Sequence, residues 1–232
     1  MFKNKLGNSS VLFGAATGAV ILFGTVLGLL GIGGQPNEVA AKTMAVRVET
    51  NHQLKSAITV ESNGKNALFN KAGTLKHARV VAGKQRLATM GNSDSSKHYF
   101  RAYRVARLSN GLVYYKMVSF DGKYRGWIYG GKSTTKVAGG IKRAATVTKT
   151  AVPNAATGHA YRAGQTVWGK PKWSVYKNKL VAPNTTQYLH HDLRILDAKR
   201  LTREGTVYYY VQNLNDSTLN GWVRSDGIVD KT

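Results

Sequence analysis

The chain has 232 residues and no cysteine, and its 34 Lys and Arg side chains against 11 Asp and Glu give a formal net charge of +23 at pH 7. The lack of cysteine excludes disulfide bonds and thiolate metal sites. A positive excess of this size destabilises a compact fold by self-repulsion unless anions relieve it. The charge therefore indicates an anionic partner; the alternative is a basic surface that only keeps the protein soluble.

The first 41 residues have the pattern of a secretory signal. A basic segment, Met1–Lys5, precedes an apolar stretch from Val11 to Gly34, and small residues follow up to Ala41. We predict a signal helix and signal peptide over residues 1–41, cut after Ala41, with Ala45 as the second choice. The alternative is an uncleaved membrane anchor, because about 20 apolar residues can span a bilayer. In both cases the rest of the chain lies outside the cytoplasm.

The remaining sequence contains two copies of one module. Matching segments keep their order and spacing, which indicates an internal repeat. The matching pairs are Ala67–Lys71 with Thr166–Lys170, His98–Arg101 with His191–Arg194, Arg107–Tyr115 with Arg200–Tyr209, and Tyr124–Ile128 with Leu219–Val223. The third pair has one additional residue in the second copy. We therefore predict module 1 over residues 67–132 and module 2 over residues 166–232.

Two further segments have weaker patterns. Residues 42–66 are predicted as an N-terminal extension, in which the alternating run Ala45–Val48 either adds an edge strand or is disordered. Residues 133–165 are rich in Thr, Ala, Gly and Lys and show no apolar periodicity. That composition predicts a linker between the modules.

Alternating side chains predict short β-strands in both modules. Val113, Tyr115 and Met117 are expected to face the core and Tyr114 the opposite side, and the run Val207–Gln212 alternates in the same way.

Glycines predict the hairpin turns beside these strands. Asn110-Gly111 and Glu204-Gly205 come before them, and Asp121-Gly122 follows the first, where glycine can supply the positive φ of a turn. No segment after the signal helix has a helical pattern. The expected fold class is all-β, with two small barrels or sandwiches in tandem.

The positive charge is uneven along the chain. Residues 42–132 carry a net +13, residues 133–165 carry +5, and residues 166–232 carry +4. Module 1 and the linker are therefore the expected surface for a polyanion.

The order of turns and aromatic residues resembles known modules. A turn, Val-Tyr-Tyr, a second turn and then Gly-Trp with an apolar residue is similar to the GW and bacterial SH3-like modules that tether proteins to Gram-positive walls. Tyr99–Tyr103, Val113–Lys116 and Asp121–Lys132 look more closely like the amino-terminal wall-binding region of lactobacillar S-layer proteins. The match also takes in the leader, Ala67–Phe69, Ala138–Lys142 and the second copy.

This resemblance implies two tandem SH3-like barrels in a secreted protein of the cell wall or S-layer. It further implies non-covalent binding to teichoic acid or neutral wall polysaccharide. Such S-layer proteins usually continue into a larger self-assembly region, whereas this sequence ends at Thr232, so a short S-layer-like or S-layer-associated protein is expected. The alternative is a structural S-layer subunit that acts mainly by self-assembly, with its own copies or other S-layer subunits as partners.

Basic and aromatic side chains are the candidate ligand contacts. Lys and Arg bind phosphates by charge-assisted hydrogen bonds, while aromatic rings stack on the C–H faces of sugars. Single basic residues are usually solvated, and the Gly-Trp tryptophans have packing as their alternative role. The candidates are Arg101, Arg104, Arg107, Lys116, Lys123, Arg125, Lys132, Lys142 and Arg143, with Tyr114, Trp127, Tyr208 and Trp222 as the aromatic contacts.

No pattern supports catalysis, a metal site or a cofactor. Ser-x-x-Lys matches begin at Ser62, Ser133 and Ser174, but no Lys-Thr-Gly or Ser-Asp-Asn companion motif is present. The six histidines do not form a ligand set. Charge and aromatic content fit nucleic-acid binding, but the leader argues against a physiological nucleic-acid partner, and a membrane is a partner only if the leader stays uncleaved. We expect a binding protein rather than an enzyme.

Overall fold

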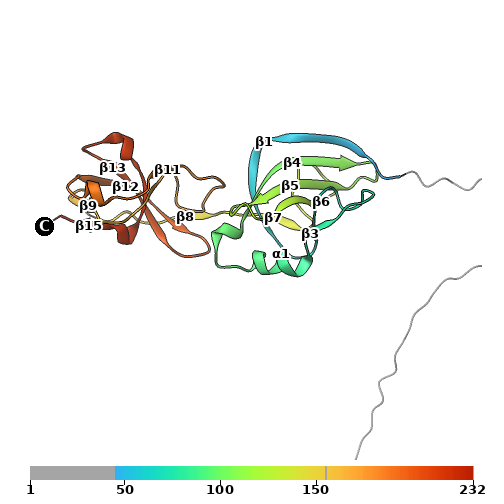
Figure 1. Ribbon diagram of the computed structural model, residues 1–232, viewed down its shortest axis with the longest axis horizontal. Coiled ribbons are helices and arrows are strands. Elements are labelled where there is room, and N and C mark those ends of the chain that lie inside the picture. The colour runs from blue at the N-terminus through green and yellow to red at the C-terminus, as the bar shows by residue number, and fades with distance from the viewer. Residues whose placement is uncertain (1–44, 155, 232) are drawn as a thin grey trace, which may run out of the picture. The chain divides into compact units, whose positions relative to one another are not determined.

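Two curled antiparallel sheets make up the described part of the chain, residues 45–154 and 156–231, in the computed structural model (Figure 1). Each sheet is a half-barrel that contains one copy of the repeat, so the predicted all-β class and tandem SH3-like modules are confirmed. The predicted signal peptide lies outside the described residues. Within the described residues no helix is long and apolar enough to cross a membrane.

The first sheet has seven strands in the order β3-β2-β6-β5-β4-β1-β7. The turn glycines predicted from sequence are in place: Gly111 between β4 and β5 has φ 77°, and Gly122 between β5 and β6 has φ 78°. The strands are β1 (Val48–Ser62), β2 (Leu68–Phe69), β3 (Val80–Ala82), β4 (Phe100–Leu108), β5 (Val113–Ser119), β6 (Arg125–Gly131) and β7 (Ile141–Arg143).

The second sheet repeats this topology. Its strands follow the order β11-β10-β14-β13-β12-β9-β15, with β8 also paired to β12. They are β8 (Val147–Lys149), β9 (His159–Tyr161), β10 (Val167–Trp168), β11 (Leu180–Ala182), β12 (Leu193–Leu201), β13 (Val207–Asn213), β14 (Gly221–Arg224) and β15 (Ile228–Asp230). Short 3₁₀ turns are η1 (Ser96–His98), η2 (Thr186–Tyr188), η3 (Ser217–Leu219) and η4 (Ser225–Gly227).

The predicted N-terminal extension and linker contain strands of the two sheets. β1 pairs with β4, Val48 opposite Leu108 and Val60 opposite Phe100. β8 and β9, in the predicted linker, both pair with β12, so together they take the place that β1 has in the first sheet. β1 and β8 carry many exposed side chains, the three residues of β9 are all buried, and all three strands depend on a distant partner strand, so their own sequence has little alternation. Each structural copy therefore begins earlier than the sequence repeat indicated.

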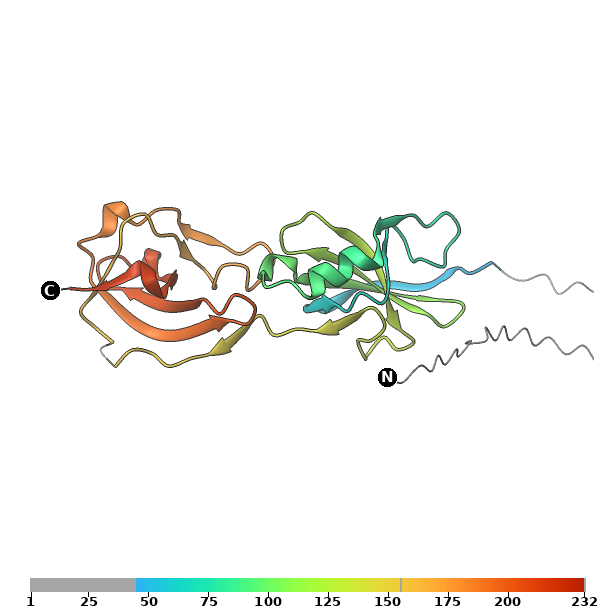
Figure 2. The same cartoon turned by 90° about the horizontal axis from the view of Figure 1, so that it is seen from below.

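One α-helix was not predicted. α1 (Lys84–Gly91) buries Leu87 and Met90, three residues apart on one face, in the core of the first sheet, and it lies over that sheet in Figure 2. With only eight residues, it is held by tertiary packing more than by intrinsic propensity, so its sequence pattern is weak. The second copy has no α-helix at this point, because the connection after β11 is shorter.

Each sheet packs side chains on both faces. Val113, Tyr115 and Met117 lie in the main core of the first copy, as predicted. The opposite face carries a smaller group of apolar side chains, which we name the outer cluster. In the first copy it consists of Ala72, Ala106, Leu108, Tyr114 and Trp127, and in the second of Leu201, Tyr208 and Trp222.

Close strand approach explains the Gly-Trp dipeptides. A Cβ added to Gly126 would lie 2.4 Å from the carbonyl oxygen of Phe69, and one added to Gly221 would meet its nearest atom at 2.6 Å. Real Cβ atoms do not approach neighbours so closely, so only glycine lets β2 and β10 lie against β6 and β14. The tryptophan that follows is 8% exposed in the first copy and 4% in the second, and it fills the outer cluster.

We expect Gly126→Ala and Gly221→Ala each to lower the free energy of unfolding by about 1–3 kcal/mol, because overpacking forces the neighbouring strand to shift. Chemical denaturation followed by tryptophan fluorescence measures this. Gly83→Ala is the matched control, since a Cβ there meets no atom within 4 Å. Equal stability of all three variants would show that strand approach does not select these glycines.

Candidate functional site

The three arginines of β4 point to a surface with few acidic groups. Arg104 donates from Nε to Oδ1 of Asn51 at 2.7 Å, which is a neutral partner. Arg107 has a carboxylate nearby, but its Nε lies 3.7 Å from Glu49 and both side chains are more than 40% exposed. Arg101 lies with its guanidinium 5.3 Å from the centre of the Tyr103 ring. These cations are therefore largely available to an external anion.

Arg125, at the start of β6, joins Arg101 in an arginine–tyrosine cluster. Its Nη1 donates to the hydroxyl of Tyr103 at 3.0 Å and its Nη2 to the hydroxyl of Tyr176 at 3.4 Å. The bond to Tyr103 raises the pKa of Arg125. Tyr176 belongs to the second copy, so the arginine–tyrosine cluster (Arg101, Tyr103, Arg125 and Tyr176) contains side chains from both copies.

The other basic candidates are more scattered. Lys123 and Lys132 are exposed in the β5–β6 turn and just after β6. On β7, Lys142 forms a 2.8 Å ion pair with Glu61, while its neighbour Arg143 is exposed. The nine candidate cations are thus spread over the first sheet, and of these only Arg101 and Arg125 belong to the arginine–tyrosine cluster.

The four aromatic candidates are buried. Tyr114, Trp127, Tyr208 and Trp222 are each at most 8% exposed and belong to the outer clusters. Burial raises the pKa of Tyr208 to about 12. A lysine covers each Gly-Trp ring, with the Nζ of Lys116 5.8 Å and that of Lys199 4.8 Å from the ring centres. In this structure their prominent role is packing.

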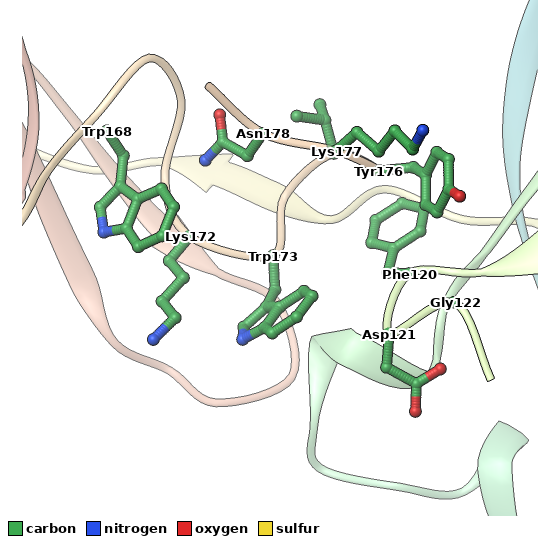
Figure 3. A pocket seen from close by; sticks show the side chains of 10 residues that line it. Phe120, Asp121, Gly122, Trp168, Lys172, Trp173, Tyr176, Lys177 and Asn178 are labelled. Carbon is green, nitrogen blue, oxygen red and sulfur yellow. The ribbon is translucent and has the colours of Figure 1, made fainter. Parts of the chain in front are cut away.

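A pocket of about 360 Å³ lies where the β5–β6 turn of the first copy meets the β10–β11 loop of the second. We name it the junction pocket; Figure 3 shows Trp168 and Trp173 on one side of it and Phe120 and Tyr176 on the other. Its volume is within the range of small-molecule sites, roughly 300–1,000 Å³. A smaller hollow of about 160 Å³ shares Phe120, Val175 and Tyr176 with it and reaches Arg101.

Arg203 joins the two copies, and the next residue, Glu204, lines a further hollow together with Lys172 and Trp173 of the junction pocket. It lies in the turn between β12 and β13, and its side chain is only 7% exposed. Its Nη1 donates to the carbonyls of Met90 and Ser95 at 3.0 and 3.1 Å, and its Nη2 donates to Gly91 O and Glu61 Oε2, both at 3.1 Å.

Two further contacts complete this junction. The guanidinium carbon of Arg203 lies 4.0 Å from the centre of the Tyr99 ring. The neighbouring Glu204 accepts hydrogen bonds from the backbone N–H and the hydroxyl of Ser96, at 2.5 and 2.6 Å. We name these two residues the Arg203–Glu204 anchor. They bind α1 and η1 of the first copy, which places the two walls of the junction pocket side by side.

A comparison with known protein families finds one family in both copies of the repeat. The profile of the GW (Gly-Tryp) dipeptide domain matches residues 49–129 and 143–229, which is more than half of the chain. The chain belongs to the GW domain family. GW domains are cell-wall-binding modules. The first match includes β1 from its second residue, and the second match includes β8 and β9, which the sequence repeat had left outside the modules.

Other comparisons add little to the GW assignment. A crystal structure described as that of an autolysin from Listeria monocytogenes is 13% identical, with a TM-score of 0.33, and the match covers 81% of this chain and 67% of that one. The comparison with curated proteins found no match.

Among residues 45–154 and 156–231, no group of three or more His, Asp or Glu side chains could hold a metal ion. The side chains described above offer charge, hydrogen bonds and aromatic contact for recognition.

Sequence reasoning missed the residues of the β10–β11 loop. Trp173 and Tyr176 lie between lysines in a loop with no strand periodicity. Aromatic residues in an otherwise basic loop were the available signal, since such side chains are costly to expose without a use. The other wall, at Phe120, could not be paired with them from sequence, because the two segments are distant in the chain and meet only in the folded structure.

We expect Arg203→Ala to lower the free energy of unfolding by about 2–4 kcal/mol, since it leaves three partly buried carbonyls and a partly buried carboxylate without this donor. Arg200→Ala, in the same hairpin but exposed, is the matched control. Denaturant titration of both variants provides the comparison. If the two variants lost equal stability, Arg203 would have no special role.

The ion pair between Arg203 and Glu61 predicts a loss of stability in acid. Burial tends to raise the pKa of Glu61, but Lys142 and Arg203 outweigh it and hold this pKa below its ordinary value of 4.5. A carboxyl whose pKa is lower in the folded state stabilises the fold above the unfolded value and loses this effect as pH falls through the folded value. Between pH 7 and pH 3, the wild type should lose more stability than Glu61→Gln. Glu49→Gln, which removes the exposed ion pair with Arg107, should lose as much stability between these pH values as the wild type.

Proposed function

We propose that this protein is exported and binds non-covalently to the cell wall of a Gram-positive bacterium, as an S-layer-like surface protein. The proposed ligand is an anionic wall polymer of the teichoic acid type. The observation that carries this is the set of uncompensated cations on the first GW domain. Of the nine basic candidates, only Arg107 and Lys142 have a carboxylate within 4.0 Å in the described part of the chain.

In the part of the chain that the structure describes, most of the acidic partners of basic side chains lie in the second domain, which leaves more cations of the first domain without a carboxylate partner. Of the seven ion pairs among the described residues, four lie within the second domain and two within the first, and the seventh joins the domains through Arg203. A polymer that carries many phosphates can replace the missing internal partners. The first domain therefore supplies most of the electrostatic contact in this proposal.

Two linked domains strengthen a weak interaction. When one domain holds the polymer, the second meets it at a high effective concentration, so the pair binds more tightly than either domain alone. The Arg203–Glu204 anchor supports this by holding both GW domains in one arrangement. The resemblance to the wall-binding region of lactobacillar S-layer proteins supports the cell-surface role.

Mixing the purified protein with isolated Gram-positive walls tests the proposal. The protein should sediment with intact walls, and the bound fraction should fall with rising salt and after hydrofluoric acid extraction of the phosphate polymers. Failure to sediment with intact walls would refute the proposal. Binding that survives both treatments would favour a neutral polysaccharide, and ordered arrays seen by electron microscopy without wall binding would favour self-assembly.

Charge removal should affect the two domains unequally. We expect the triple variant Arg101→Gln, Arg104→Gln, Arg107→Gln to bind walls about tenfold more weakly, because three charge contacts at the protein surface contribute about 0.5 kcal/mol each. The matched control is Arg194→Gln, Lys199→Gln, Arg200→Gln on β12, the equivalent strand of the second domain. Sedimentation over a range of wall concentrations gives both affinities. Equal losses would contradict the proposed division between the domains.

A further inference from the structure

We propose that the junction pocket binds a pyranose ring of the wall polymer, with neighbouring phosphates held by the basic side chains at its rim. This inference rests on the wall-binding function proposed above and assigns the sugar contact to a site that both GW domains build. It moves the aromatic contact away from Trp127 and Trp222, which packing already occupies.

The pocket has the surface that a sugar ring requires. Its indole and phenol rings offer flat apolar faces to C–H groups, and Trp168, Trp173 and Tyr176 remain partly exposed, whereas Phe120 forms a buried wall. Pyranose hydroxyls also need polar partners at the edge of the ring. Asp121 lines the pocket, and within residues 45–154 and 156–231 only its Oδ1 is engaged, by the hydroxyl of Ser119 and the backbone N–H of Lys123. Its second oxygen can accept a hydrogen bond from a ligand hydroxyl.

Backbone strain concentrates in the same loop. Trp173 has φ 62° and Lys177 has φ 53°, values in the left-handed region that bulky side chains seldom adopt. The equivalent loop of the first copy has one such residue, His77. Strained backbone persists where the surrounding structure holds it, and it gathers at binding sites. At Trp173 the strained conformation places an indole in the pocket instead of in a core.

The charges around the pocket match a sugar that carries phosphate. Lys172 and Lys177 lie on its rim, with their Nζ atoms 5.5 Å from the Trp168 ring centre and 5.9 Å from the Tyr176 ring centre. Neither lysine has a carboxylate within 4.0 Å among the described residues. The adjoining hollow leads to Arg101. A polymer with its sugar in the pocket can therefore extend its phosphates toward lysines on one side and the arginine–tyrosine cluster on the other.

The pocket exists only while the two GW domains stay in contact. One wall comes from the β5–β6 turn and the other from the β10–β11 loop, and the Arg203–Glu204 anchor joins the domains beside them. Occupation of the pocket should thus stabilise the contact between the domains, and loss of the anchor should weaken binding without any change in a lining residue.

Trp173→Gly gives the sharpest test. Glycine adopts positive φ without strain, so this variant should keep or raise the resistance to denaturant while it removes the indole. We expect its affinity for isolated walls to fall about tenfold or more, as for a central aromatic contact. Lys172→Gln should also bind more weakly, and Lys179→Gln, exposed in the same loop but outside the pocket, should match the wild type. Arg203→Ala should weaken binding as well.

A second measurement separates this inference from the wall-binding function. The repeating units released from the same walls by hydrofluoric acid, which have lost their phosphates, are titrated into the protein while tryptophan fluorescence is recorded. A saturable change that Trp173→Gly abolishes supports the sugar site. No saturable change, or wild-type wall binding by Trp173→Gly and Lys172→Gln, overturns it and leaves the wall-binding function standing. If the wild type does not bind walls at all, the wall-binding function fails, and the titration alone decides on the pocket.

Discussion

One buried guanidinium connects the two halves of this protein. Arg203 donates to three backbone carbonyls and one carboxylate while it lies over the Tyr99 ring. A planar group with five donors can satisfy such an arrangement, whereas a lysine ammonium presents its donors from one point. The carbonyls of Met90 and Gly91 lie at the end of α1, where backbone acceptors lack helical partners and attract cations. A single side chain therefore binds the end of the helix and joins the two domains.

The Gly-Trp dipeptide serves each domain in a comparable way. Its glycine removes a side chain where a neighbouring strand passes, and its tryptophan fills the outer face that the curled sheet would otherwise expose. The dipeptide thus packs the junction of two strands, and in our proposal ligand contact falls to other side chains. This separation frees the loops around β10–β11 to differ from those of the first domain without a loss of the common core.

Sequence patterns were informative where local rules apply. Gly111 and Gly122 marked turns because positive φ is a local requirement, and Val113 and Met117 marked a core face because a strand alternates. β1, β8 and β9 were assigned to an extension and a linker because partner strands, not their own alternation, hold them in place. α1 was missed because only Leu87 and Met90 signal its buried face. The junction pocket depends on contact between segments distant in sequence, which a pattern within one segment does not reveal.

The two copies are no longer interchangeable. The β12–β13 turn of the second copy is one residue longer and contains Arg203 and Glu204, which bind α1 and η1 of the first copy. The corresponding turn of the first copy contains Asn110-Gly111 instead, and the second copy has no α-helix in the segment equivalent to α1. The contact is therefore heterologous and has a direction. Neither copy can repeat it with a further neighbour, so it closes at a pair instead of propagating along an array. The two copies of the repeat therefore differ in a complementary way: the second supplies the Arg203–Glu204 anchor, and the first supplies the α1–η1 segment that the anchor binds.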